Sequence, residues 1–260
     1  MANIVVTVGP SSIELDVLNK LLLSGADKFR INLSHSTKES LTSYTNNLLK
    51  LGISPAVDTQ GQQLRVVGFS SNLNNNLGTK ISLLFNSNDL YKEEDFPYMR
   101  FNHPEAFNQI DIGDIIKVDF DGLALRVLEK KEKLNYLNAE VISKGNIILN
   151  RAVDVQSKLI KLSSLTEFDK YALNYSLSKG CKEVYASFIS SKDDILKVRD
   201  VIGQDVKLIS KIETARGVAN VKEIIENSDE ILIDRGDLSR EISIPAIPMA
   251  VFNILKIAKS

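Results

Sequence analysis

Four charged side chains stand at the ends of two consecutive apolar strands that the sequence predicts within residues 207–241. Lys211 and Glu213 close the first strand, and Arg235 and Asp237 close the second. Because the C-terminal ends of the strands gather at one face of a parallel β/α fold, we expect these side chains to face a common ligand. Two carboxylates beside two cations suit a divalent metal ion that holds an anionic substrate.

The composition is that of a globular chain with a large core. Its 260 residues, 43% of them hydrophobic, are enough for one barrel or for two smaller units. A net charge of -1, with no strongly basic stretch, argues against nucleic acid as the main partner. The single cysteine, Cys181, excludes an internal disulfide and fits a reducing compartment. No apolar stretch is long enough for a membrane span and the N-terminus does not resemble a signal peptide, so the sequence predicts a cytoplasmic protein without a membrane partner.

Strand-like and helix-like stretches alternate over most of the chain. Apolar and β-branched runs predict six strands, at 3–8, 28–33, 55–59, 183–188, 207–212 and 230–233. Apolar residues at helical spacing, with Ser12 as a cap and Gly25 and Gly52 as stops, predict helices between them. These helices are expected between 12 and 25, over 37–52, 166–178, 192–202 and 218–226, and within 246–259.

The alternation breaks after Gly61. Residues 63–156 predict an all-β insertion, because short strands at 64–69, 80–85, 114–120, 123–130 and 138–143 are separated by Asn, Gly and Asp turns. Strands joined by helices with right-handed crossovers imply a parallel sheet. We therefore predict an α/β fold, an incomplete (β/α) TIM-type barrel formed by residues 1–62 and 157–260 with an inserted β-rich lid domain at 63–156.

Six motifs resemble those of the pyruvate kinase family, in the same order and interrupted at the same place by a β-rich domain. They are IVVTVGPSS, FRINLSH, AVDTQGQQLR, EVYASFI, LISKIE and ILIDRGDL. Each alone would be a weak signal, whereas the ordered set is specific. The resemblance implies a phosphotransferase that moves a phosphoryl group from phosphoenolpyruvate to ADP, giving pyruvate and ATP, with Mg²⁺ (or Mn²⁺) and K⁺ as cofactors.

The resemblance also implies roles for single residues. Lys211 would stabilise the transferring phosphoryl group and the enolate oxygen, and Arg30 would pair with the phosphate. Glu213 and Asp237 would hold the divalent ion, and the backbone N–H groups of Gly236 and Asp237 would receive the substrate carboxylate. Two further sets are implied: Asn32, Ser34, Asp58 and Thr59 for K⁺, and Asn32, His35, Arg65 and Arg151 for the nucleotide.

Each of these residues also has a plainer interpretation. A single Lys or Glu at a strand end is usually a solvated surface residue. Arg235 and Asp237 could form only a salt bridge or a helix start, and Asp58 could cap a turn with Thr59. The ordered motifs favour the site interpretation over these alternatives.

Several positions depart from the family pattern. Gln60 stands where the family usually has lysine, Asp234 replaces a small residue, Ser239 replaces glycine, and Arg151 falls where a lysine is usual in the lid. Asp234 adds a negative charge near a site for a trianionic substrate, and it either serves as another metal ligand or points away.

Three function classes remain open. We favour an active enzyme, and the alternatives are a regulatory or binding module that senses phosphoenolpyruvate without turnover and a barrel subunit that a partner chain completes. The chain stops at Ser260, after the sixth unit, so the last two barrel strands and the C-terminal domain of the family are expected to be missing. Strands 3–8 and 230–233 would then be open edges, which predicts a homo-oligomer or a partner that covers them.

Overall fold

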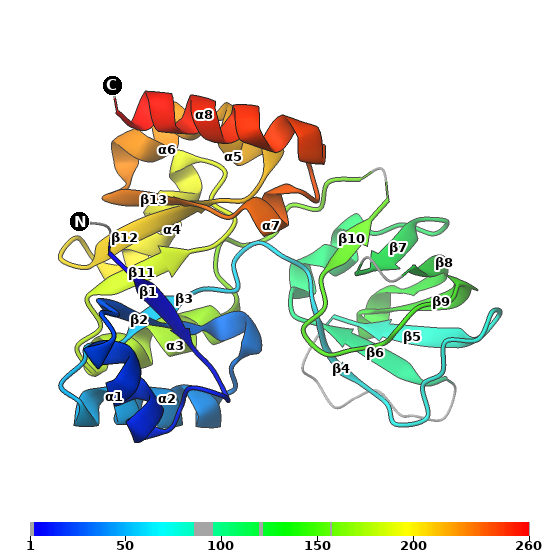
Figure 1. The fold of residues 1–260 in the computed structure, drawn as a ribbon. Helices are drawn as coiled ribbons and strands as arrows, with labels where there is room; N and C mark the ends of the chain where they lie inside the picture. The colour runs from blue at the N-terminus through cyan, green and yellow to red at the C-terminus, as the bar shows by residue number, and fades with distance from the viewer. Residues whose placement is uncertain (1–2, 86–95, 120–121, 157, 260) are drawn as a thin grey trace. The chain divides into compact units, whose positions relative to one another are not determined.

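The computed structural model describes residues 3–85, 96–119, 122–156 and 158–259 (Figure 1). The chain divides into two compact units: unit 1 is Met1–Gln62 with Ser164–Ser260, and unit 2 is Gln63–Ser163. The first boundary lies between residues 62 and 63, as expected, whereas the second lies between residues 163 and 164 and not between 156 and 157. The reason is that Ile160 and Leu162 pack against the core of unit 2, and Lys158 Nζ donates hydrogen bonds to two carboxylates of that unit.

Unit 1 is built on a parallel sheet whose strand order follows the chain. Its strands are β1 (Val5–Val8), β2 (Lys28–Asn32), β3 (Ala56–Asp58), β11 (Glu183–Ala186), β12 (Lys207–Ile212) and β13 (Glu230–Ile233). Neighbouring strands pair in parallel throughout. This arrangement confirms the predicted α/β fold with a partial β/α barrel, and within the described sheet β1 and β13 are the outer strands.

Helices connect these strands as the sequence pattern predicts, with three differences. The helices are α1 (Leu15–Leu23), α2 (Lys38–Lys50), α3 (Glu167–Ser178), α4 (Lys192–Ile202), α5 (Ala215–Ala219), α6 (Val221–Asn227), α7 (Arg235–Leu238) and α8 (Ile247–Ala258). Ser12 does not cap α1, because its hydroxyl accepts from Gly9 N in the preceding turn. The helix expected over 218–226 is divided at Asn220 into α5 and α6. The short α7 was not predicted, because four residues are too few to show a helical period.

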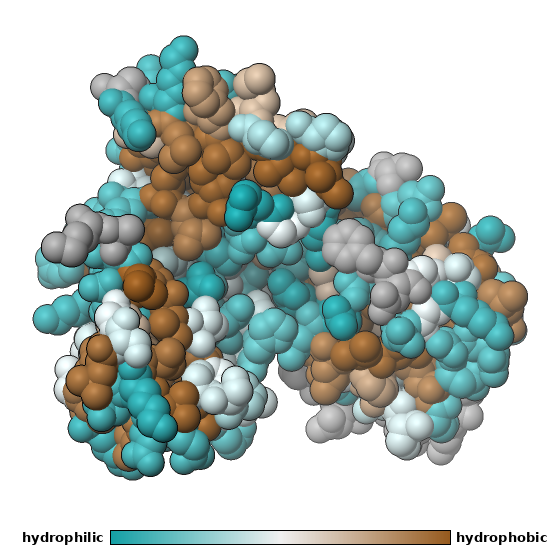
Figure 2. All heavy atoms as spheres, viewed as in Figure 1, coloured by the Kyte–Doolittle hydropathy of each residue, from teal (hydrophilic) through white to brown (hydrophobic). Residues whose placement is uncertain are grey.

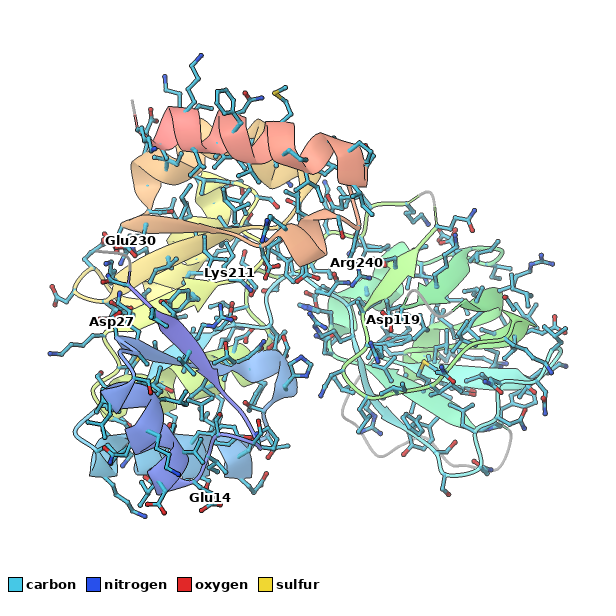
Figure 3. The ribbon with its side chains drawn as sticks, viewed as in Figure 1. Glu14, Asp27, Asp119, Lys211, Glu230 and Arg240 are labelled. Atoms are coloured by element: carbon cyan, nitrogen blue, oxygen red, sulfur yellow. The ribbon has the colours of Figure 1, made fainter. Side chains whose placement is uncertain are left out.

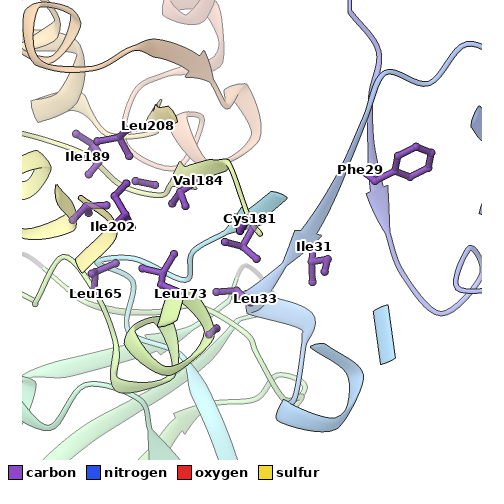
Figure 4. Packing of buried hydrophobic residues seen from close by; sticks show 14 of the residues in the cluster. Phe29, Ile31, Leu33, Leu165, Leu173, Cys181, Val184, Ile189, Ile202 and Leu208 are labelled. Atoms are coloured by element: carbon purple, nitrogen blue, oxygen red, sulfur yellow. The ribbon is translucent and has the colours of Figure 1, made fainter. Parts of the chain in front are cut away.

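The core of unit 1 lies between the sheet and its helices. Figure 4 shows Ile31, Val184 and Leu208 of the strands and Leu173 of α3 among these buried side chains. Each fully buried aliphatic side chain contributes about 1.5–3 kcal/mol relative to an exposed one. Cys181 also belongs to this core, and burial raises the pKa of its thiol to about 11, so it is a protonated packing residue.

The C-terminal helix leaves apolar surface exposed. Figure 1 shows α8 over α6, and its buried residues are Ala250 and Ile254. Met249 and Phe252 are 63% and 64% exposed, and Figure 2 shows apolar side chains gathered at this end of unit 1. Helices of the described residues include none that is long and apolar enough to cross a membrane.

Unit 2 is a seven-stranded sheet, which confirms the predicted all-β insertion. In spatial order its strands are β10 (Val153–Val155), β7 (Ile115–Val118), β8 (Leu123–Lys131), β9 (Tyr136–Ser143), β5 (Lys80–Leu84), β6 (Tyr98–Phe101) and β4 (Val66–Phe69). All neighbours pair antiparallel except β5 and β6, which are parallel. β6 and β10 were not predicted, although other strands of three or four residues, such as β3 and β13, were.

A buried histidine and a glutamate tie two segments of unit 2 together. His103 is 1% exposed, and its Nδ1 lies 3.0 Å from Glu105 Oε1. The same oxygen accepts from Ser163 N at 2.7 Å. Burial alone would raise the pKa of Glu105, but the hydrogen bonds from His103 and Ser163 outweigh it and lower the pKa to about 2. The ionised form of Glu105 therefore stabilises the fold.

Glu105→Gln is expected to destabilise the protein at pH 7 by about 1 kcal/mol, since a buried charged hydrogen bond contributes about 1.5–3 kcal/mol and solvent screens part of it here. The folded-state pKa is depressed, so this contribution is present above the unfolded-state pKa and is lost as the pH falls from about 5 towards 2. Thermal unfolding of both proteins across this range should show the difference shrinking. The exposed Glu132 provides the control Glu132→Gln, and a difference that is independent of pH would contradict the expectation.

Candidate active site

The predicted charged residues of unit 1 come together because parallel strands place their C-terminal ends at one edge of the sheet. The register pairs Asn32 of β2 with Asp58 of β3, and Lys211 of β12 with Leu232 of β13. Lys211 is the last residue but one of β12, and Glu213 directly follows the strand. Both side chains are buried. The sheet thus gathers side chains that are far apart in the sequence.

Lys211 is the centre of this group (Figure 3). It is 5% exposed, and its Nζ lies 2.8 Å from Glu213 Oε1, 3.2 Å from Asp58 Oδ1 and 3.1 Å from the Ser187 hydroxyl. Burial by itself lowers the pKa of Lys211, but the charges of Asp58 and Glu213 outweigh it and raise the pKa above its ordinary value. Lys211 is therefore a permanent, fixed ammonium group and not a proton acceptor.

Arg30 adds a second cation on the neighbouring strand β2. Its NH1 lies 3.2 Å from Asp58 Oδ2, its NH2 donates to the Thr7 hydroxyl at 2.9 Å, and its guanidinium lies 5.4 Å from the centre of the Tyr185 ring. Arg30 Nε is buried and has no hydrogen-bond partner among the described residues. A buried donor of this kind is usually satisfied, which fits an anionic ligand at this position.

The carboxylate of Glu213 is held by a strained backbone. Its Oε2 accepts from Phe188 N at 2.6 Å, and Phe188 has a φ of 57°, which is rare for a bulky side chain. Such strain persists where the surrounding structure fixes it, often at functional sites. Burial raises the pKa of Glu213 above its ordinary value, and Lys211 offsets only part of this rise. A further positive charge nearby would favour the ionised carboxylate.

Three carboxylates form a candidate metal centre. Oxygen atoms of Glu213, Asp234 and Asp237 all lie within 4.8 Å of one another. Asp234 does not point away: its Oδ2 lies 3.6 Å from Lys211 Nζ, and its Oδ1 accepts from Gly236 N at 3.2 Å. An all-oxygen, mostly carboxylate set suits Mg²⁺ or Mn²⁺. Arg235, in contrast, is exposed at the start of α7, whereas Lys211 and Glu213 are buried and Asp237 is half-buried.

The charges of this group do not balance. Two cations meet four carboxylates, so an excess of two negative charges remains when all are ionised: Arg30 and Lys211 against Asp58, Glu213, Asp234 and Asp237. A divalent cation would remove this excess. The residues present therefore fit the metal that the sequence predicts.

The residues assigned to K⁺ lie together at the ends of β2 and β3. Asn32 Oδ1 accepts from Ser34 N at 2.9 Å, and this bond starts the short helix η1 (Leu33–His35). The Thr59 hydroxyl accepts from Ser187 N at 2.9 Å, while Asp58 faces Ser187 and the two cations. Oxygen atoms of Asn32, Asp58 and Thr59 thus bond within the protein, and the role of this set in binding K⁺ stays a prediction.

The residues assigned to the nucleotide are divided between the two units. Asn32 and the exposed His35 belong to unit 1. Arg65 and Arg151 belong to unit 2, where Arg65 pairs with Ala152 in an antiparallel bridge. Arg65 NH1 donates to the Asn150 carbonyl at 2.9 Å, and Arg151 NH1 lies 2.8 Å from Asp119. Their role stays a prediction.

Sequence reasoning missed Ser187 and Phe188, which join the lysine and the glutamate of the site. A signal for Ser187 exists, because it follows β11 directly and the rule that found the other strand ends applies equally to this strand. Phe188 could not have been found in this way, since its contribution is a backbone N–H and not a side chain.

Comparison with known proteins supports the family resemblance of the sequence motifs. The family model of the pyruvate kinase barrel domain matches residues 1–260. The chain is 31% identical over 270 residues to the pyruvate kinase of Schizosaccharomyces pombe, an alignment that covers 99% of this chain and 52% of the relative. It is 30% identical to the pyruvate kinase of Kluyveromyces lactis and 31% identical to pyruvate kinase 1 of Saccharomyces cerevisiae, each over 94% of this chain and 51% of the relative. The chain thus spans about half the length of these relatives. The protein belongs to the pyruvate kinase family.

Proposed function

We propose that this chain carries the active site of a pyruvate kinase-like phosphotransferase, which moves a phosphoryl group from phosphoenolpyruvate to ADP to give pyruvate and ATP. The observation that carries the proposal is the fixed ammonium group of Lys211, held between Asp58 and Glu213 beside three clustered carboxylates. Phosphoryl transfer needs positioning and charge neutralisation more than proton transfer by the protein. A permanent cation beside a metal centre meets that need.

Each residue then has a role that its chemistry supports. The P–O bond to the enolate breaks while a P–O bond to the terminal phosphate of ADP forms, and the enolate afterwards takes up a proton. Lys211 would neutralise charge on the enolate oxygen and the transferring phosphoryl group, and Arg30 would hold the phosphate through its guanidinium. A divalent ion, held by Glu213, Asp237 and Asp234, would supply further charge neutralisation.

Asp234 distinguishes this site from the family pattern. Its carboxylate takes the Gly236 N–H, one of the two backbone donors that the resemblance assigns to the substrate carboxylate. It also places a negative charge 3.6 Å from Lys211. Asp234 would therefore compete with the anionic substrate while adding a ligand for the metal. This observation supports the second candidate, a protein that binds phosphoenolpyruvate without efficient turnover.

Further expectations belong to the same proposal. K⁺ would bind at Asn32, Ser34, Asp58 and Thr59, and the nucleotide would contact Asn32, His35, Arg65 and Arg151. A cytoplasmic location and self-association through the outer strands β1 and β13 also remain proposals. Both strands carry apolar residues, and Val5 in the outer strand β1 is 41% exposed. Such an apolar, unpaired edge favours a covering partner.

A titration tests the proposed function directly. Phosphoenolpyruvate is expected to bind saturably in the presence of Mg²⁺ and K⁺, with weaker binding when K⁺ is replaced by Na⁺ or Li⁺ at constant ionic strength, since a site of neutral and carboxylate oxygens suits a large, weakly hydrated ion. Calorimetry measures the affinity, and a coupled assay of pyruvate formation with ADP measures turnover. Binding with turnover supports the enzyme, and binding without it supports the sensor. No binding with Mg²⁺ and K⁺ would exclude both.

A further inference from the structure

A fully buried carboxylate outside the candidate site holds one of its turns. Asp169, the third residue of α3, is 0% exposed. Its Oδ1 accepts from Gln60 N at 2.7 Å, and its Oδ2 accepts from Gly61 N at 3.1 Å and from Thr166 N at 2.9 Å. Three backbone N–H groups from two distant segments therefore meet on one side chain.

Capping of α3 explains only part of this arrangement. A capping box needs the bond from Asp169 to Thr166 N and the return bond from Asp169 N to the Thr166 hydroxyl, and both are present. The bonds to Gln60 and Gly61 are additional, and they join residues 109 and 108 positions away in the sequence. The carboxylate therefore does more than start its own helix.

Gln60 strengthens the same connection through its side chain. Its Oε1 accepts from the Thr166 hydroxyl at 3.1 Å, and its Nε2 donates to the Leu33 carbonyl at 3.2 Å. Gln60 is 6% exposed, so all of these bonds are shielded from water. Gln60, one of the positions that depart from the family pattern, thus belongs to this buried network.

The turn held by Asp169 carries site residues. It follows β3 over residues 58–61, and it contains Asp58 and Thr59. Gly61 has a φ of +67°, and a Cβ there would lie 2.5 Å from the Ser187 carbonyl oxygen, so the turn packs directly on the backbone after β11. Ser187 N donates to the Thr59 hydroxyl, the Ser187 hydroxyl donates to Asp58, and Lys211 Nζ donates to that hydroxyl. Contacts therefore run without a gap from Asp169 to Lys211.

We infer that Asp169 is a positioning residue of the proposed active site, whose carboxylate fixes the turn at 58–61 and thereby sets how Asp58 faces Lys211 and how Thr59 holds Ser187. The inference rests on the proposed function for its catalytic consequence. Its structural part, that Asp169 holds the amides of Gln60 and Gly61, stands separately.

Asp169→Asn tests the inference because it keeps the size of the side chain while replacing one acceptor oxygen by an NH₂ group, which cannot accept from an N–H donor. We expect kcat to fall about tenfold or more, since small displacements of positioned groups have large effects on rate. Mg²⁺ affinity should stay unchanged, because its proposed ligands lie on or after β12 and β13.

Asp194→Asn is the matched control. Asp194 is also the third residue of its helix, α4, is 6% exposed, and accepts from Ser190 N and the Ser191 hydroxyl, yet it bonds to no residue of the turn at 58–61. Both substitutions are expected to lower the melting temperature. Only Asp169→Asn is expected to lower kcat and to shift the ¹H–¹⁵N signals of Gln60 and Gly61.

Amide hydrogen exchange in the unchanged protein gives a test that does not depend on a variant that folds. The Gln60 and Gly61 amides are expected to be strongly protected, and fast exchange at both would overturn the inference. So would an Asp169→Asn protein with lowered stability but unchanged kcat and unchanged signals for both amides. If the unchanged protein neither binds nor turns over phosphoenolpyruvate, the proposed function fails, and the amide measurements alone decide whether Asp169 holds the turn.

Discussion

Lys211→Met is expected to lower kcat for phosphoryl transfer from phosphoenolpyruvate by on the order of 10²-fold or more, with a smaller effect on substrate affinity. The ammonium group is held in one place by Glu213 at 2.8 Å and by the Ser187 hydroxyl at 3.1 Å. A charge fixed in advance stabilises chiefly the charge that develops in the transition state. A coupled assay of pyruvate formation, with a separate titration of phosphoenolpyruvate binding, measures the two effects.

The same substitution is expected to destabilise the protein. Asp58 and Glu213 are each 1% exposed; Asp58 would keep Arg30 at 3.2 Å, whereas Glu213 would lose the cation that lies 2.8 Å from it. Leaving a buried charge without its partner typically costs about 3–5 kcal/mol. Thermal unfolding should therefore show a large loss in the absence of metal, and added Mg²⁺ should recover part of it by restoring a positive charge beside Glu213.

Lys207→Met is the control on the same strand. Lys207 lies at the start of β12 and pairs with Glu230 on the exposed side of unit 1, so its removal takes away a lysine without touching the site. Its kcat and stability should stay close to those of the unchanged protein. An unchanged kcat in Lys211→Met would remove Lys211 from the proposed reaction.

Glu213→Gln and Asp237→Asn are each expected to weaken binding of Mg²⁺ or Mn²⁺ by about tenfold or more, because each removes a charged oxygen from the candidate metal centre. The fold should survive in Glu213→Gln, since the amide oxygen can still accept from Phe188 N. Mn²⁺ titrations followed by electron paramagnetic resonance measure the affinity without any need for turnover. The exposed Glu230 supplies the control Glu230→Gln.

Asp234→Ala separates the two effects of the unusual third carboxylate. Metal binding should weaken because a ligand is lost, whereas phosphoenolpyruvate binding at saturating Mg²⁺ should become tighter. The second effect is expected because the Gly236 N–H is released and a negative charge 3.6 Å from Lys211 is removed. Unaltered metal affinity in all three variants would refute the metal assignment, and weaker substrate binding in Asp234→Ala would refute the competition.

Local sequence patterns were sufficient for most elements of the fold. Leu41, Tyr44 and Leu48 recur at helical spacing after Thr37, and the structure buries all three in α2 and starts the helix at that threonine. The pattern failed at α7, whose four residues are too few to show a helical period, and it missed β6 and β10. It also failed at Asn220, where one predicted helix is two.

Sequence patterns were also sufficient to predict which side chains lie close together at the edge of the parallel sheet. Strand ends in a parallel sheet meet at one edge, so two apolar runs, one followed by Lys211 and Glu213 and the other by Asp237, were enough to predict that these side chains lie close together. This follows from topology alone and needs no knowledge of side-chain direction.

How those side chains are used became visible in the folded protein. The sequence left open whether Asp234 faces the site or points away, and the structure turns it towards Lys211 and the Gly236 N–H. No sequence pattern indicates that Phe188 supplies a backbone donor to Glu213, or that Asp169 holds amides more than 100 residues away. Such contacts depend on backbone angles and on the packing of one strand-end turn against another, and neither quantity is carried by residue type or spacing.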